Sequence, residues 1–201
     1  MKVYGDHESG NCYKLRLLLS HLDRSYEWVD VDVLKRETRT PEFLAKNPNG
    51  RVPVVELDDG KFLAESNAIL FYLARGSDFL PARGWEQAQT LQWMFFEQYS
   101  HEPYIATSRY WIHYLNEREK YKDKLAEKRD PGYAALGVME RHLDAHPFFV
   151  GPRMTFADIA LYAYTLVAGE GDFDLQPYPA VRDWIERVAS VPGHIAMRRR
   201  R

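Results

Sequence analysis

The sequence predicts a small α/β domain followed by an all-helical domain. Strand and helix patterns alternate along the N-terminal part of the chain, and the strand patterns stop near Pro81. Beyond that point, apolar residues recur three or four positions apart, which is the spacing of a helix face. We therefore expect an α/β domain over residues 1–76, a linker over 77–84 and a helical domain over 85–201.

The first domain reads as strand, helix, strand, helix, two strands and a final helix. Leucines at helical spacing follow the first strand, and valines alternate with acids in the second. Asp58-Asp59-Gly60 is a hairpin signal between the last two strands. A strand–helix–strand unit predicts a parallel pair, to which the hairpin adds antiparallel strands. The strands are expected at residues 2–4, 26–32, 52–57 and 61–64, and the last helix after Ser66 as N-cap.

Four helices are expected in the second domain, each marked by apolar residues on one face. Pro179 lies near the start of the last helix and Pro192-Gly193 follows its end, as helix boundary signals do. The markers of the four helices are Leu91–Phe95, Leu136–Leu143, Ile159–Leu166 and Val181–Val188.

Thr155 and Asp158 have the spacing of a capping box at the start of the third of these helices. Met154 and Ile159 are placed to form a hydrophobic staple around it. We interpret this motif as a folding signal for a buried helix, with a purely structural role.

Composition narrows the function classes. The 201 residues carry a net charge of −2, so no global basic field would attract nucleic acid. The lone cysteine, Cys12, excludes an intramolecular disulfide and a cysteine-cluster zinc site, and the seven histidines show no metal-ligand spacing. The apolar runs are too short to span a bilayer, and the start is charged. We expect a cytoplasmic protein without metal, nucleic-acid or membrane partners, in which Arg198–Arg201 form a solvated terminus.

The turn between the first strand and the first helix is a candidate anion site. Ser9 and Asn11 are N-cap residue types, and Gly10 permits close backbone approach. A helix N-terminus offers free N–H groups and partial positive charge, which favour an anion. Taken alone, however, helix capping explains these residues better.

Two further segments suggest recognition of a peptide-like ligand. In Asn47–Val55, Pro53 interrupts a strand, which leaves the backbone of Val52 able to pair with an extended ligand. Glu65-Ser66 lies at the start of a predicted helix and has two interpretations. It is either an ordinary helix cap or a site that binds the ammonium and carboxylate groups of an amino acid. In the second interpretation Glu65 takes the ammonium and Ser66 the carboxylate.

In this order and spacing the motifs resemble the glutathione S-transferase superfamily over essentially the whole chain. The resemblance implies a thioredoxin-like N-terminal domain, an all-helical C-terminal domain, a cis Val52–Pro53 bond and a homodimer. The features that carry it are the Ser9–Cys12 loop, Asn47-Pro48-x-x-x-Val52-Pro53, Glu65-Ser66 and Thr155-x-x-Asp158.

The resemblance also implies a set of site residues. Ser9 lies where theta-, zeta- and related classes carry a catalytic serine, and Asn11 matches an asparagine of bacterial nu-like members. The glutathione-binding residues implied by position are Arg51 for the glycyl carboxylate, Val52 for the cysteinyl backbone, and Glu65 and Ser66 for the γ-glutamyl end. Thr38 lies where theta-class enzymes carry a histidine, and Arg39 beside it is an alternative carboxylate partner.

Other residues have weaker claims to a role in the site. Tyr4 would correspond to the catalytic tyrosine of the alpha, mu and pi classes, but its place within a strand favours packing. Cys12 is better explained as a buried free thiol, because a dithiol cycle needs a second cysteine. The aromatic stretch from Gln92 to Trp111 is mostly core, and the resemblance implies that one or two rings face a hydrophobic substrate pocket.

The implied activity is a glutathione transferase acting on small hydrophobic electrophiles. Lowering a thiol pKa by about two units needs ~2.7 kcal/mol. A charge-assisted hydrogen bond, worth roughly 1.5–3 kcal/mol, and a helix N-terminus, worth about 0.3–1 kcal/mol, supply it without a general base. A glutathione-dependent disulfide or peroxide reductase, favoured by Asn11, remains an alternative, as does a non-catalytic interaction module.

Overall fold

The structure, a computed structural model, describes residues 1–197 and divides into two units. The first unit is Met1–Ser77 with the segment that begins at Pro192, and the second is Asp78–Val191. The sequence assigned every residue from 85 onward to the helical domain, whereas the chain from Pro192 to Met197 is hydrogen-bonded to the first helix. The Arg198–Arg201 run lies outside the described residues.

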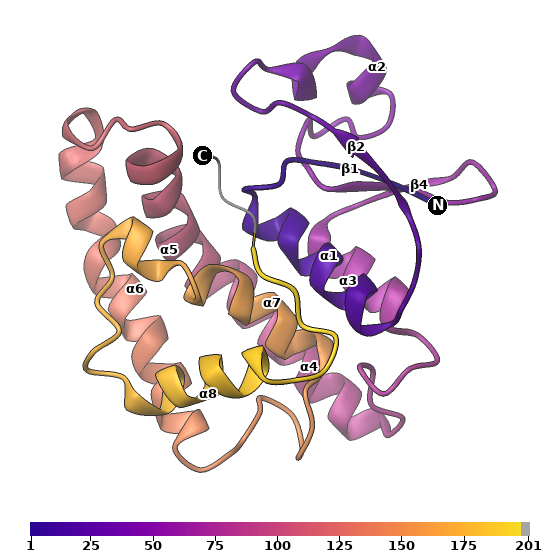
Figure 1. The fold of residues 1–201 in the computed structure, drawn as a ribbon. Helices are drawn as coiled ribbons and strands as arrows, with labels where there is room; N and C mark the ends of the chain where they lie inside the picture. Colours follow the sequence, from indigo (N-terminus) through magenta and orange to yellow (C-terminus); the bar gives the residue numbers. More distant parts are fainter. Residues whose placement is uncertain (198–201) are drawn as a thin grey trace. The chain divides into compact units, whose positions relative to one another are not determined.

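The first unit contains a four-stranded mixed sheet in the order β2-β1-β3-β4. Strand β1 pairs in parallel with β2 and antiparallel with β3, which pairs antiparallel with β4. Figure 1 shows α1 and α3 on one face of the sheet and α2 on the other. The expected element order is confirmed. Its bounds are β1 Lys2–Gly5, α1 Gly10–His21, β2 Glu27–Asp30, α2 Pro41–Leu44, β3 Val54–Glu56, β4 Phe62–Ala64 and α3 Ser66–Ala74.

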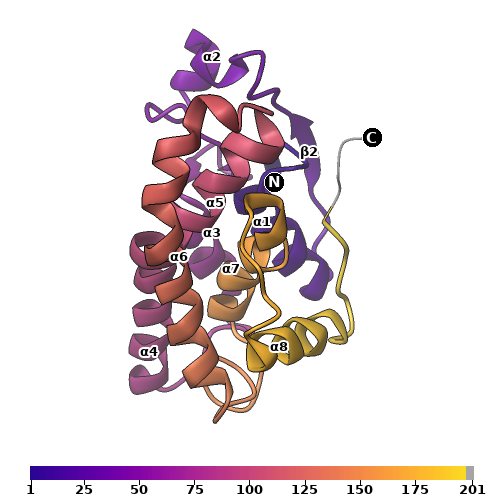
Figure 2. The same ribbon diagram turned by 90° about the vertical axis from the view of Figure 1, so that its left-hand side faces the viewer.

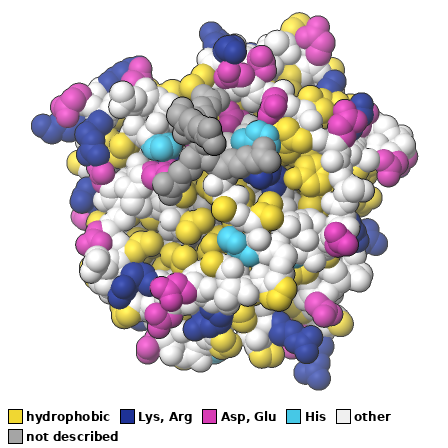
Figure 3. All heavy atoms as spheres, in the orientation of Figure 1, with side chains coloured by type: hydrophobic (Ala, Val, Ile, Leu, Met, Phe, Trp, Pro, Cys, Tyr) yellow, Lys and Arg dark blue, Asp and Glu magenta, His cyan; other side chains and the backbone are white. Residues whose placement is uncertain are grey.

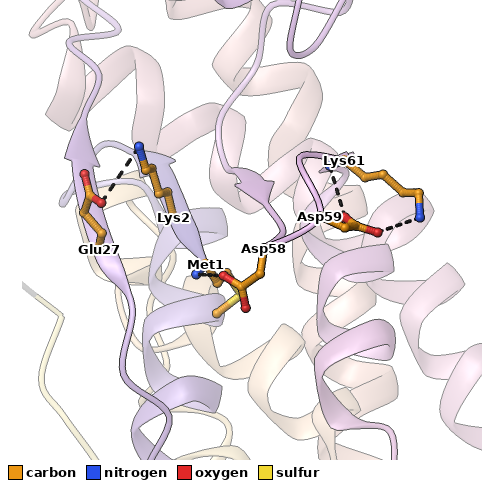
Figure 4. A network of polar contacts seen from close by, with 6 residues as sticks. All are labelled: Met1, Lys2, Glu27, Asp58, Asp59 and Lys61. Carbon is orange, nitrogen blue, oxygen red and sulfur yellow. Dashed lines mark hydrogen bonds and ion pairs between the residues drawn. The ribbon is translucent and has the colours of Figure 1, made fainter.

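Polar pairs line the sheet end that includes the β3–β4 hairpin (Figure 4). The Met1 ammonium contacts Asp58 at 2.5 Å, and Lys61 contacts Asp59 at 2.6 Å. Gly60 has a φ of 80°, which a glycine adopts without steric cost. The predicted hairpin is therefore present, with exposed ion pairs that add little to stability.

The second unit is helical throughout its regular structure. All four expected helices are present, and the structure adds a fifth within the aromatic stretch from Gln92 to Trp111. π-helical turns at Glu97–His101 and Tyr110–Tyr114 flank a separate helix α5. Figure 2 shows α5 and α6 side by side. The bounds are α4 Gly84–Phe96, α5 Glu102–Arg109, α6 Lys122–Leu143, α7 Phe156–Thr165 and α8 Pro179–Ala189.

The capping box at the start of α7 is confirmed. Thr155 is the N-cap, and both of its reciprocal hydrogen bonds with Asp158 and the helix backbone are present. The fully buried Asp158 carboxylate accepts from Thr155 N at 2.8 Å, Thr155 Oγ1 at 3.1 Å, Phe149 N at 3.0 Å and Trp184 Nε1 at 3.0 Å. One side chain thus joins α7, α8 and the segment before α7.

The described surface carries side chains of both charges. Basic and acidic side chains are interspersed over the face drawn in Figure 3. Among residues 1–197, no helix has both the length and the apolar character needed to cross a membrane. Within the same range, no three His, Cys, Asp or Glu side chains gather as metal ligands.

Candidate glutathione site

Ser9 caps the N-terminus of α1. Its backbone is extended, and its Oγ accepts a hydrogen bond from Cys12 N at 3.3 Å. The cap uses the hydroxyl oxygen as acceptor, and a side-chain hydrogen bond also links the Ser9 hydroxyl to the Cys12 thiol. No acidic residue lies in the first turn of α1, but the buried side chains of Asp6 and Glu8 lie just before it and offset part of the positive charge of the helix end.

Asn11 and Ser66 connect the ends of α1 and α3. Ser66 Oγ donates to Asn11 Oδ1 at 3.1 Å, so the amide oxygen is occupied and the Nδ2 hydrogens remain for another acceptor. Ser66 was expected to be the N-cap of α3. It is instead the first helical residue, and no side chain caps this helix, so Ser66 is used for tertiary contact.

Glu65 precedes α3 with φ 65° and ψ 109°. A non-glycine residue held at positive φ costs of order 1–3 kcal/mol, and such residues cluster at functional sites. The Glu65 side chain is exposed, and its Oε1 lies 3.5 Å from Asn49 Nδ2. This backbone conformation therefore presents a carboxylate at the surface, where an ammonium group can reach it.

The loop between α2 and β3 is organised by Asn47. Its Nδ2 donates to Arg51 O at 2.8 Å, and its Oδ1 accepts from Asn49 N at 3.0 Å. The Val52–Pro53 peptide bond is cis, as the resemblance implies. Because β3 begins only at Val54, the peptide groups of Val52 lie outside the β1–β3 ladder.

Arg39 joins the same loop from the other side. Its Nη1 donates to Asn49 O at 3.1 Å. Gly50 has a φ of 61°, and a Cβ there would lie 2.5 Å from Arg39 Nη1 and 2.9 Å from Thr38 O, so only glycine fits. Thr38 is only 5% exposed, whereas Arg39 is exposed and able to meet a carboxylate. The structure thus favours Arg39 of these two candidates.

Tyr4 and Cys12, the two other residues considered for a role in the site, both have structural roles. Tyr4 Oη donates to Glu56 Oε2 at 2.6 Å, and the ring packs in a cluster with Phe43 and Val54. Burial, together with Glu56, raises the pKa of Tyr4 to about 12. Cys12 is fully buried, and burial raises the pKa of its thiol to about 12. Tyr4 is a packed strand residue and Cys12 a buried thiol, as expected.

Sequence reasoning missed the supporting roles of Asn47 and Asn49. Both were interpreted as turn residues, yet Asn47 holds the Arg51 carbonyl and Asn49 contacts Glu65. The turn sequence Asn-Pro-Asn-Gly marks the loop but does not indicate these partners, of which Arg51 lies in the same loop and Glu65 just before α3.

Comparison with protein families decides the relationship. The family model for the glutathione S-transferase N-terminal domain matches residues 1–75, and the model for the C-terminal domain matches residues 92–192. The chain belongs to the glutathione S-transferase family. The predicted family and its fold, an α/β N-terminal domain followed by a helical domain, are therefore confirmed.

Several glutathione S-transferase relatives are similar over nearly the whole chain. The disulfide-bond oxidoreductase YfcG of Escherichia coli (strain K12) is 30% identical over 91% of this chain and 87% of that protein. A crystal structure of glutathione S-transferase from Pseudomonas fluorescens is 54% identical, with a TM-score of 0.96 over 98% of each chain. The glutathione transferase URE2P8 from Phanerochaete chrysosporium, solved with oxidized glutathione, is 28% identical with a TM-score of 0.84 over 96% of this chain and 90% of that one.

Proposed function

We propose that this family member is an enzyme that binds glutathione and activates its thiol as a thiolate for attack on small hydrophobic electrophiles. The observation that carries the proposal is the Ser66–Asn11 hydrogen bond, because it brings the start of α3 to the start of α1. Glu65 then meets the ammonium of the γ-glutamyl end, and Ser66 meets its carboxylate. In this proposal residues 1–76 bind glutathione, 77–84 link the domains, and the helical residues from 85 to 191 supply the apolar second-substrate pocket.

The rest of glutathione is assigned to the loop between α2 and β3. The backbone of Val52 pairs with the cysteinyl residue, and Arg51 or Arg39 meets the glycyl carboxylate. Ser9 Oγ, or Asn11 Nδ2, donates to the sulfur at the positive end of α1. Each charge of the tripeptide then faces a complementary group, while no residue has to remove the thiol proton as a general base.

A second candidate function is the reduction of disulfides or peroxides with glutathione. Asn11 favours it, because its amide oxygen is held by Ser66 and its Nδ2 hydrogens are left for a thiolate. The name of the similar disulfide-bond oxidoreductase from Escherichia coli supports the same reaction. In that reaction the glutathione thiolate attacks the substrate disulfide and releases a thiolate.

A turnover panel separates these functions. The purified protein is given glutathione with an aryl halide, a small-molecule disulfide or an organic peroxide, and product formation is measured for each. We expect turnover of the aryl halide to dominate. Dominant turnover of the disulfide or the peroxide would instead establish the reductase. Failure to be retained on immobilised glutathione, together with no turnover, would identify a non-catalytic interaction module.

Replacing Glu65 with alanine is expected to raise the glutathione KM about 10-fold and to change kcat much less. Glu65 contacts a part of glutathione that does not react, so its contribution is mostly uniform binding of ground and transition states. Ser66→Ala is expected to act in the same direction. Steady-state kinetics over a range of glutathione concentrations measure both constants. Glu42→Ala, which removes an exposed carboxylate on α2, is the control, and a large fall in kcat at saturating glutathione would refute the assignment.

We also propose that the protein is a homodimer. We expect it to reside in a reducing compartment such as the cytoplasm, where its single cysteine stays free. Leu91, Phe95 and Tyr99 follow one another at helical spacing from α4 into the next turn. Phe95 is 71% exposed and Tyr99 83% exposed, and apolar rings in a row favour a protein interface. Sedimentation at micromolar concentration is expected to give the mass of two chains, and a stable monomer would refute the dimer.

A further inference from the structure

An open pocket lies in the first unit at the C-terminal half of α1, and its volume is about 570 Å³. This volume is in the range of sites that bind small molecules. Its walls come from α1, from the turn that follows α1, and from the segment Pro192–Met197, which we call the C-terminal strap. Lining residues used below are Arg16, Leu19, Arg24, Tyr26, Ile195 and Ala196.

The C-terminal strap is fastened to α1, along which it runs in Figure 1. Tyr13 Oη donates to Ile195 O at 2.7 Å, and Ser20 Oγ donates to Gly193 O at 2.7 Å. His21 Nδ1 lies 2.9 Å from Pro192 O. Hydrogen bonds to α1 therefore hold the part of the pocket wall that the C-terminal strap contributes.

Three charged side chains line this pocket, the exposed Asp23 and Arg24 and the buried Arg16. Arg16 is the one that bears on an anion site. It is only 6% exposed, and within residues 1–197 its Nη1 is buried without a hydrogen bond. Its guanidinium lies 5.8 Å from the ring centroid of Trp28, which attracts the charge but accepts no bond in the guanidinium plane. Arginine stays protonated in proteins, and burying an unpaired charge is costly. A bound anion would remove that cost.

The other lining residues define what kind of anion fits. Arg24 adds a second cation at the exposed rim, where its Nη1 donates to Leu73 O at 3.1 Å and its remaining N–H groups stay available. Leu19, Tyr26 and Ile195 supply an apolar wall. The planar guanidinium fork matches carboxylate and phosphate oxygens in pairs.

We propose that this pocket binds a small organic anion, in which a carboxylate or phosphate pairs with Arg16 and an apolar body packs against Leu19, Tyr26 and Ile195. The site is separate from the proposed glutathione site. Arg16 follows Ser9 by seven residues on α1, which is about 10 Å along the helix axis at 1.5 Å per residue. The two ligands can therefore be bound at once.

The test is calorimetric titration of the whole protein with phenyl phosphate in a phosphate-free buffer. Benzoate tests the carboxylate, and inorganic phosphate tests the anionic group without the apolar body. We expect one molecule of phenyl phosphate or benzoate per chain, weaker binding of inorganic phosphate, and unchanged affinity in saturating glutathione. The tighter of the two aryl anions identifies the preferred group.

Two variants locate the binding. Arg16→Gln is expected to weaken the aryl anion about 10-fold or more, since it removes a charge-assisted hydrogen bond. Ala196→Phe fills the pocket from the strap and leaves Arg16 in place, and it is expected to weaken binding as much. Arg75→Gln, which removes an exposed arginine after α3, is the matched control and should bind as the parent does.

Four results would overturn the proposal. These are no binding of either aryl anion to the parent, displacement of the anion by glutathione, unchanged binding in Ala196→Phe, and unchanged binding in a folded Arg16→Gln protein. If circular dichroism shows that Arg16→Gln does not fold, Ala196→Phe decides the question. Equal affinity for inorganic phosphate and phenyl phosphate would overturn the claim that an apolar body packs against Leu19, Tyr26 and Ile195.

Discussion

Replacing Asp158 with alanine is expected to lower the free energy of unfolding by about 3 kcal/mol or more, because each buried donor left unsatisfied costs about 1–3 kcal/mol. The carboxylate is fully buried and accepts four hydrogen bonds, from Thr155, Phe149 and Trp184. Its loss leaves all of these donors unsatisfied in the core and also removes half of the capping box. Urea unfolding followed by circular dichroism measures the loss.

The pH of that measurement matters, because burial raises the pKa of Asp158 to about 6 against the opposing effect of its donors. A carboxyl group whose pKa is raised on folding adds stability below its unfolded pKa, near ~4, and loses that contribution as the pH rises through the folded pKa. We therefore specify pH 7.5 (about 1.5 units above that pKa), where Asp158 is charged in both states.

A matched control separates the buried network from charge removal. Asp144→Ala deletes an exposed carboxylate after α6 and is expected to change stability by about 0.5 kcal/mol or less. Asp158→Asn keeps the size of the side chain but turns one acceptor into a donor, so it is expected to lose stability as well. An Asp158→Ala protein as stable as the Asp144→Ala protein would contradict the role assigned to this network.

Replacing Ser9 with alanine is expected to lower the rate at neutral pH about 10- to 200-fold, which corresponds to a lost charge-assisted hydrogen bond of roughly 1.5–3 kcal/mol. The variant should also raise the apparent pKa of bound glutathione, so part of the rate returns as the pH rises. Asn11→Ala is expected to cost less. The measurement is the thiolate absorbance of bound glutathione as a function of pH for the parent and both variants.

Ser66→Ala makes this comparison sharper, because it releases the Asn11 amide that Ser66 orients. If Ser9 is the donor, Ser66→Ala changes glutathione affinity and leaves the pKa of the bound thiol close to that of the parent. Ser190→Ala, at the exposed end of α8, controls for the loss of a serine. A raised pKa in Asn11→Ala with an unchanged pKa in Ser9→Ala would reverse the ranking and favour the disulfide reductase.

The candidate site could be predicted in part, because its motifs combine local backbone rules with a resemblance. Ser9 as N-cap of α1 follows from its residue type and position. Ser66 shows where such reasoning fails, since the same rule made it a cap while the structure uses its hydroxyl to hold Asn11. The burial of Thr38 is a different case, because its place behind the Gly50 turn cannot be deduced from a single threonine in the sequence.

The sequence by itself determined the elements whose causes are local. Apolar residues recurring every three or four positions predicted the helices, and the alternation of apolar and polar residues predicted the strands. Asp58-Asp59-Gly60 predicted the hairpin, and Thr155 with Asp158 predicted the start of α7. Only the tertiary structure decided the division of α4 from α5, the return of the C-terminal strap to α1, and the buried position of Arg16. These features depend on contacts between residues far apart in the chain, and no local propensity encodes which distant group a carbonyl or a guanidinium will meet.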